Sequence, residues 1–169
     1  MSSVEPLARI AVGAIAERHK ARSAWIDHVW RPVAVLPAPS HLAPWTEIGG
    51  DADCVRYYAG AAAIELYPSS TASYRDNLAS GAPLLWLVLR PTGREPPYSV
   101  AAVTADPGEG EAFNESASDL VEAVPMPELV RQAIAEFIAG HYAERPFVKR
   151  KRDRADPQAM ARVPAKDRR

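Results

Sequence analysis

The chain is poor in cysteine, since Cys54 is the only one among 169 residues. One cysteine excludes an internal disulfide, and it cannot supply the several thiolates of a cysteine-rich zinc or iron–sulfur site. Its rarity also favours a reducing compartment. The four histidines, His19, His28, His41 and His141, lack the His-x-x-x-His spacing of a common metal motif. We therefore expect no metal site and no cofactor.

Long hydrophobic runs are also missing. The longest, Pro83–Leu89, is far shorter than the roughly 20 apolar residues that a membrane-spanning helix needs. Near the N-terminus, Glu5 stands where an export signal carries positive charge, and the apolar stretch Ile10–Ala16 is followed at once by charged residues. We expect a soluble, cytoplasmic protein without a membrane partner.

Charge is unevenly distributed, although the net charge is only −1. Residues 1–104 carry nine basic and nine acidic residues, whereas residues 105–144 carry Arg131 against nine acids. Residues 145–169 carry ten basic residues against three acids. The positive charge thus gathers in a C-terminal stretch that follows an acidic one.

Hydrophobic patterning predicts a strand-rich domain. We expect strands at Leu7–Glu17, Val29–Leu36, Trp45–Ile48, Val55–Tyr67, Leu84–Leu89, Tyr98–Thr104 and Val121–Val124. The first stretch also fits a helix, but its alternation favours a strand. Pro32 lacks an amide donor, which predicts an edge strand or a bulge, and Gly60 marks a second bulge. Leu84–Leu89 is apolar on both faces and is expected to be central, paired with Tyr98–Thr104.

Two helices are expected. A short one spans Ala72–Ala79, with hydroxyls of Ser69–Thr71 as N-caps and Gly81 at its C-terminal end. A longer one begins at Pro127 and reaches about residue 142. Its apolar stripe consists of Leu129, Val130, Ala133, Ile134, Phe137, Ile138 and His141. Residues 106–118 are rich in glycine and acids and predict a loop with one helical turn near Phe113.

This order of elements predicts an α+β fold with a mostly antiparallel sheet, a short inserted helix, a C-terminal helix and a basic tail. Residues 1–146 are expected to form a single domain, because hydrophobic residues make up 47% of the chain and charged residues 24%. Hydrophobic periodicity ends after that point, so residues 147–169 are interpreted as the tail.

No group of residues forms a catalytic pattern, and we expect the protein not to be an enzyme. Asp27 and His28 are adjacent on a strand and so point to opposite faces. Gly108–Gly110 lacks the spacing and the lysine of a phosphate-binding loop. Cys54 lies near Asp51 and Asp53, acids that raise a thiol pKa and disfavour a reactive cysteine.

The tail is the candidate contact site. Five basic residues stand within six positions, Lys149, Arg150, Lys151, Arg152 and Arg154, and Phe147 precedes them as an apolar anchor. Such a run suits nucleic acid, anionic lipid or an acidic protein, or it serves only solubility. No nucleic-acid motif accompanies it, which disfavours that partner. The four tryptophans are interpreted mainly as core residues, although Trp25 and Trp30 flank a turn, where the alternative is a surface anchor.

Three groups of residues carry a family resemblance: Trp25–Pro37; Tyr58–Leu66 with Tyr74–Leu78 and Trp86–Pro91; and Val124–Pro127 with Pro146–Arg152. They resemble a proteobacterial family of unknown function whose genes commonly neighbour those of molybdenum- or tungsten-dependent formate dehydrogenase and its maturation factors. The resemblance implies a non-catalytic accessory protein or small subunit that binds the metal-containing catalytic subunit, with Phe147–Arg154 contributing to the contact. The alternatives are a nucleic-acid binder that uses the tail, and a small enzyme that gathers His28 or His41 with carboxylates.

Overall fold

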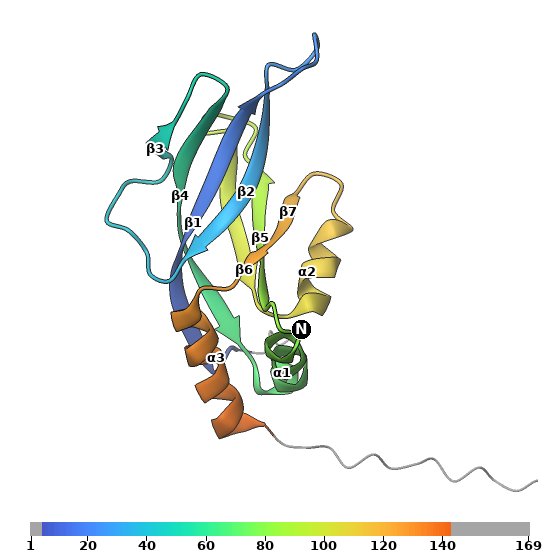
Figure 1. Cartoon of the computed structure of the whole chain (residues 1–169). Coiled ribbons are helices and arrows are strands. Elements are labelled where there is room, and N and C mark those ends of the chain that lie inside the picture. The colour runs from blue at the N-terminus through green and yellow to red at the C-terminus, as the bar shows by residue number, and fades with distance from the viewer. Residues whose placement is uncertain (1–4, 143–169) are drawn as a thin grey trace, which may run out of the picture.

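The strands form two antiparallel sheets in the computed structural model, which describes residues 5–142 (Figure 1). The first sheet has the strand order β2-β1-β4-β3 and the second has the order β6-β5-β7. The strands are β1 Ala8–Lys20, β2 His28–Leu36, β3 Thr46–Gly50, β4 Cys54–Leu66, β5 Leu84–Pro91, β6 Tyr98–Thr104 and β7 Leu120–Pro125. The predicted α+β class with mostly antiparallel sheets is confirmed.

The helices are inserted between strands or follow them. They are the 3₁₀ turn η1 Pro68–Ser70 and the α-helices α1 Thr71–Ala79, α2 Pro107–Asn114 and α3 Glu128–His141. Within residues 5–142, no helix is long and apolar enough to cross a membrane. The predicted domain boundary at residue 146 and the predicted tail lie outside the described residues.

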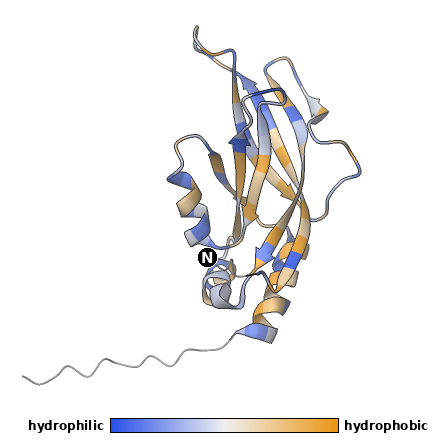
Figure 2. Ribbon diagram, turned by 180° about the vertical axis from the view of Figure 1, so that it is seen from behind, coloured by the Kyte–Doolittle hydropathy of each residue, from blue (hydrophilic) through white to orange (hydrophobic). Residues whose placement is uncertain are grey.

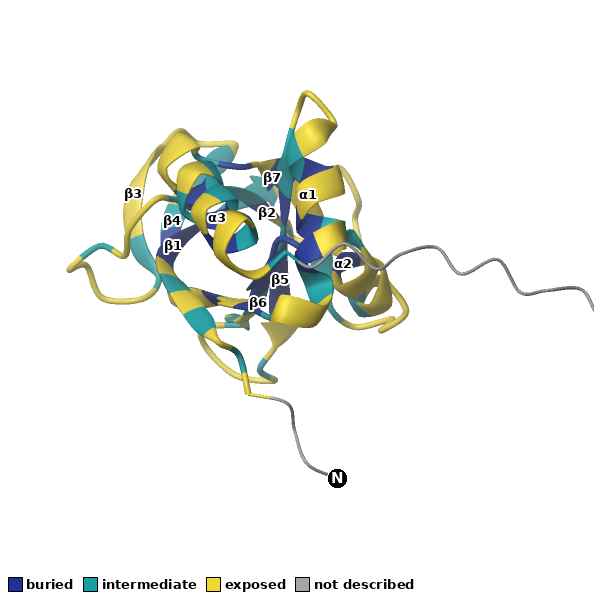
Figure 3. Ribbon diagram, turned by 90° about the horizontal axis from the view of Figure 1, so that it is seen from below, coloured by how far each residue is buried: buried dark blue, intermediate teal, exposed yellow. Residues whose placement is uncertain are grey.

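The two sheets curve around one buried interior. Strand β4 lies beside β6, and β2 lies beside β7, so the sheets meet along both sides as a flattened barrel. Figure 3 shows α1 and α3 lying across one end of this arrangement. The connection between β1 and β2 extends from the opposite end (Figure 1).

Alternate residues of the strands fill the interior. In β5 the inward side chains Leu85, Leu87 and Leu89 are fully buried, as the period of two in a strand requires. Small residues of β1, Ala14 and Ala16, face them from the other sheet. Burial of a leucine contributes roughly 1.5–3 kcal/mol, so this strand anchors the core. Figure 2 shows hydrophobic residues running along the strands and over much of α3.

Both predicted strand irregularities are present. The register between β1 and β2 shifts beside Pro32, and β2 is an edge strand of its sheet. The register between β1 and β4 shifts at Gly60, whose φ of 138° suits glycine. The second bulge sets which residues of β1 and β4 stand opposite each other further along the strands. The expected central position of β5 and its pairing with β6 are also confirmed.

Three local predictions were wrong. The acidic stretch contains a full helix, α2, because Asp106 caps its N-terminus by accepting a hydrogen bond from the Gly108 amide at 2.9 Å. Helix α1 has no side-chain cap, since the Thr71 hydroxyl donates instead to the Pro68 carbonyl. Leu129 was placed on the buried stripe of α3 but is 64% exposed. The buried residues of this helix are Val130, Ile134 and Phe137.

Asn77 joins α1 to the ends of two strands. Its amide Nδ2 donates to the carbonyls of Leu84 and Ala105 at 2.8 and 2.9 Å, and its Oδ1 accepts from the Leu84 amide at 3.0 Å. The residue is buried, so these three bonds satisfy backbone groups at a largely buried junction. The helix is thereby held against the barrel end.

Candidate functional site

The loop that joins β1 to β2 carries the most exposed large apolar side chain of residues 5–142. Trp25 is 94% exposed, and the neighbouring Ile26 and Val29 are 57% and 46% exposed. The loop is closed at its base by the Ala21 amide, which donates to the Asp27 carbonyl at 3.0 Å. The sequence favoured core packing for the tryptophans and left a surface position open for Trp25 or Trp30; Trp25 is the exposed one.

An aromatic cluster lies below this loop. Trp30 of β2 contacts the rings of Trp45, Tyr57 and Tyr98, with ring centroids 5.5, 5.4 and 6.1 Å away. The Trp30–Trp45 pair is edge-to-face at 89°, a favoured arrangement for aromatic rings. Strands from both sheets supply these rings, so the cluster ties the sheets together and gives the exposed loop a rigid base.

Arg18 of β1 stacks on the same cluster. Its guanidinium carbon lies 5.9 Å from the Trp30 ring centroid and 5.6 Å from that of Tyr57. The Nε atom is buried and has no hydrogen-bond partner among the described residues. The aromatic faces therefore provide its main electrostatic compensation.

One of the two histidine candidates of the small-enzyme alternative, His28, lies with carboxylates in one cavity. A cavity of about 350 Å³ is lined by Asp27, His28 and Asp53 together with Arg18. His28 and Asp27 thus share one cavity although the sequence predicted opposite faces, because Asp27 belongs to the loop rather than to the strand. His41 is not among the residues that line it.

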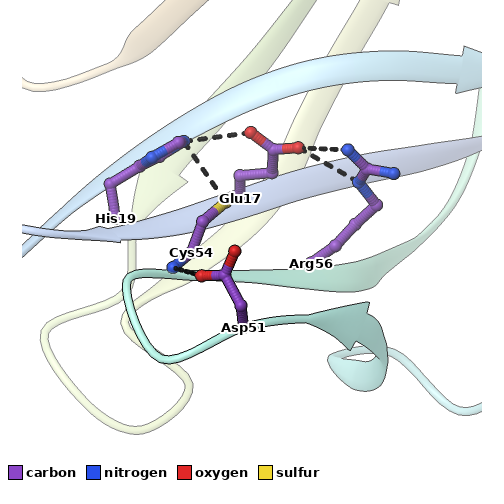
Figure 4. Close-up of polar contacts among 5 residues, drawn as sticks. All are labelled: Glu17, His19, Asp51, Cys54 and Arg56. Carbon is purple, nitrogen blue, oxygen red and sulfur yellow. Dashed lines mark hydrogen bonds and ion pairs between the residues drawn. The ribbon is translucent and has the colours of Figure 1, made fainter.

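A second cluster of polar side chains lies where β1 and β4 pair (Figure 4). Arg56 donates from Nε and Nη2 to Glu17 Oε1 at 3.0 and 2.6 Å. The other carboxylate oxygen, Oε2, lies 2.9 Å from His19 Nε2, and this nitrogen is 3.8 Å from the sulfur of Cys54. Asp51 Oδ1 accepts the backbone amide of Cys54 at 2.9 Å. We call Glu17, His19 and Cys54 the β1–β4 cluster.

Charged neighbours and burial shift the pKa values of Glu17 and Cys54. Hydrogen bonds from Arg56 lower the pKa of the Glu17 carboxyl, although partial burial opposes the change. Desolvation and the Glu17 carboxylate raise the pKa of the Cys54 thiol, and Asp51 adds to the increase. The predicted direction for Cys54 is confirmed, but the larger causes are burial and Glu17. A thiol of this kind is a weak nucleophile unless a cation binds it.

A cavity of about 620 Å³ lies between β4, β6 and α2. Small side chains such as Ala63 and Ala102 line it, together with Glu65, Tyr67 and Glu109. Both carboxylates accept internal hydrogen bonds, Glu65 from the Tyr67 hydroxyl at 2.8 Å and Glu109 from the Thr104 hydroxyl at 2.6 Å. This cavity is an acidic surface groove.

The remaining sequence candidates take structural positions or are not described. Gly110 of α2 packs against the ring of Trp86, so the Gly108–Gly110 stretch serves helix packing rather than phosphate binding. The predicted partner-binding residues lie outside residues 5–142, namely Phe147, Lys149, Arg150, Lys151, Arg152 and Arg154. The β1–β4 cluster was not predicted, although Glu17 and His19 are two residues apart and so lie on the same face of a strand.

These features define a small α+β protein with a two-sheet barrel, an exposed aromatic loop and a polar cluster on one strand pair. The chain belongs to the family described as Protein of unknown function (DUF3305), whose model matches residues 11–151. The predicted membership of a family of unknown function is thereby confirmed. No curated protein and no solved structure matches the chain.

Proposed function

We propose that this protein is a non-catalytic accessory protein or small subunit that binds the metal-containing catalytic subunit of a formate dehydrogenase. The observation that carries the binding role is the exposed tip of the β1–β2 loop, where Trp25 is 94% exposed beside Ile26. Tryptophan is enriched among the residues that dominate binding energy at protein interfaces. Association with another protein would remove this apolar surface from water.

The rigid base of the loop supports the same role. The aromatic cluster of Trp30, Trp45, Tyr57 and Tyr98 fixes the strands from which the loop extends. A contact residue held on a fixed base loses less conformational entropy on binding than one on an unsupported loop. Trp25 is therefore the expected anchor, and the basic segment Phe147–Arg154 is proposed as a second contact that adds electrostatic attraction.

The choice of partner rests on the sequence resemblance given above. Under this proposal the catalytic subunit presents an apolar pocket to Trp25 and acidic residues to Lys149–Arg154. The partner supplies the metal chemistry, and this chain supplies surface contacts. It acts in maturation or as a permanent subunit.

Copurification from cells that produce both proteins tests the proposal. The tagged full chain should retain the catalytic subunit, and Trp25→Ala should lose most of it because the anchor side chain is gone. The matched control is Leu129→Ala on α3, which removes another exposed apolar side chain, 64% exposed, from a different surface. This control should retain the partner as the unchanged chain does.

Truncation after Pro146 tests the tail separately. Loss of the partner with the shortened chain would support the second contact, whereas full retention would refute the role of Phe147–Arg154. Salt-dependent capture of DNA by the same basic residues, without capture of the catalytic subunit, would favour the nucleic-acid alternative instead.

A further inference from the structure

The β1–β4 cluster brings three different kinds of metal-ligating atom close together. His19 and Cys54 are direct cross-strand partners in the β1–β4 pairing. Glu17 precedes His19 by two residues and so lies on the same face of the strand. One ligand atom from each residue lies within 4.8 Å of the others. The backbone of two central, hydrogen-bonded strands therefore fixes the positions from which these side chains project.

The distances are close to those of a tetrahedral zinc site. Ligand atoms bonded to zinc at 2.0–2.3 Å with tetrahedral angles lie about 3.3–3.6 Å from one another. In the cluster, His19 Nε2 lies 2.9 Å from Glu17 Oε2 and 3.8 Å from Cys54 Sγ. The ligand atoms of Glu17 and Cys54 lie within 4.8 Å of each other, so side-chain rotation has to bring the three atoms to coordination distance.

Neighbouring contacts orient the ligand atoms. Arg56 occupies only Oε1 of Glu17, which leaves Oε2 directed at His19. Asp51 accepts the amides of Asp53 and Cys54, each at 2.9 Å, and so holds the turn that carries the thiol. Contacts of this kind to metal ligands commonly set their orientation. The cluster is also accessible, since the side chain of His19 is 38% exposed.

We propose that Glu17, His19 and Cys54 bind a divalent cation of the zinc class, with water as the fourth ligand. Thiolate and imidazole ligands favour zinc and cobalt over magnesium and calcium, which prefer oxygen. On binding, the Cys54 thiol releases its proton to solvent as the sulfur–metal bond forms. His19 coordinates through Nε2 and keeps its ring proton on Nδ1. This inference is independent of the partner proposed above.

Cobalt titration of the full chain, kept reduced with a phosphine, tests the site. Addition of Co²⁺ should produce the near-ultraviolet sulfur-to-cobalt charge-transfer band, which reports a bond from Cys54 to the metal. Zinc should then displace cobalt and abolish the band. Competition with a chromogenic chelator gives the zinc affinity. Cys54→Ser should abolish the band, and both Cys54→Ser and His19→Ala should weaken zinc binding at least tenfold.

His41→Ala is the matched control, because His41 lies in the loop between β2 and β3, outside the cluster. It should bind zinc as the unchanged chain does. Circular dichroism checks that each variant is folded, and His19→Gln and Cys54→Ala replace any variant that is not. The absence of a charge-transfer band in the unchanged chain, or zinc binding unaffected by Cys54→Ser or His19→Ala, would overturn the proposal.

Discussion

Replacing Asn77 with alanine tests how α1 is held to the barrel. The change removes three hydrogen bonds, two donated by Nδ2 to the carbonyls of Leu84 and Ala105 and one accepted by Oδ1 from the Leu84 amide. Each such bond contributes about 1 kcal/mol net, and a buried group that loses its partner costs up to about 3 kcal/mol. We expect a total loss of about 3–4 kcal/mol in the free energy of unfolding.

That loss is a large part of the roughly 5–15 kcal/mol by which domains of this size are stable. Urea denaturation followed by tryptophan fluorescence measures it, and the dependence of the free energy on urea concentration should stay unchanged. Asp76→Ala is the matched control in the same helix. Asp76 is exposed and paired with Arg75 on the surface, so its removal should cost less than about 1 kcal/mol.

The result that would refute this reasoning is a loss for Asn77→Ala no greater than that for Asp76→Ala. Water would then reach the strand ends and replace the amide contacts, and the junction between α1 and β5 would not be buried. If both variants instead lost about 3–4 kcal/mol, α1 would tolerate no substitution. That result would also not support a specific role for Asn77.

Three further changes have expected outcomes of definite sign. Gly110→Ala should lower the melting temperature, because the new Cβ would lie 2.3 Å from the Trp86 ring, and such overpacking costs about 1–3 kcal/mol. Gly140→Ala, with nothing within 4 Å, should raise it through better helix propensity. The pKa of Glu17 is lowered from 4.5 by Arg56, so the stabilising contribution of the carboxylate is fully present above pH 4.5 and is lost as the pH falls through the lowered value. The stability deficit of Glu17→Gln relative to the unchanged chain should therefore be largest at neutral pH and shrink in acid, as urea denaturation at several pH values would measure.

The sequence predicted the strands well because their apolar residues alternate with period two. The long helix α3 was also predicted, but Leu129 was assigned to its buried face. That helix lies across the end of the barrel and is buried along a narrow line through Val130, Ile134 and Phe137, which hydrophobicity alone does not define. Helix α2 was predicted only as one helical turn because its glycines disfavour a helix, whereas the Asp106 cap and the contact between Gly110 and Trp86 stabilise it.

The β1–β4 cluster could not be predicted, because it depends on the register between two strands that are distant in the sequence. The shift at Gly60 decides that His19 stands opposite Cys54. Without that bulge the pairing would differ by one residue, and Cys54 would move to the other face. The exposure of Trp25 ran against the favoured prediction, since tryptophans usually pack in cores and its place beside a turn gave only a weaker alternative that did not distinguish it from Trp30.

The most direct test of the central claim is the dissociation constant between the purified full chain and the formate dehydrogenase catalytic subunit. We expect specific binding that Trp25→Ala weakens by about 30-fold or more, since truncation of an anchor residue at an interface costs at least about 2 kcal/mol. Leu129→Ala should leave the dissociation constant unchanged. No binding by the unchanged chain, or equal affinities for the unchanged chain and Trp25→Ala, would contradict the account.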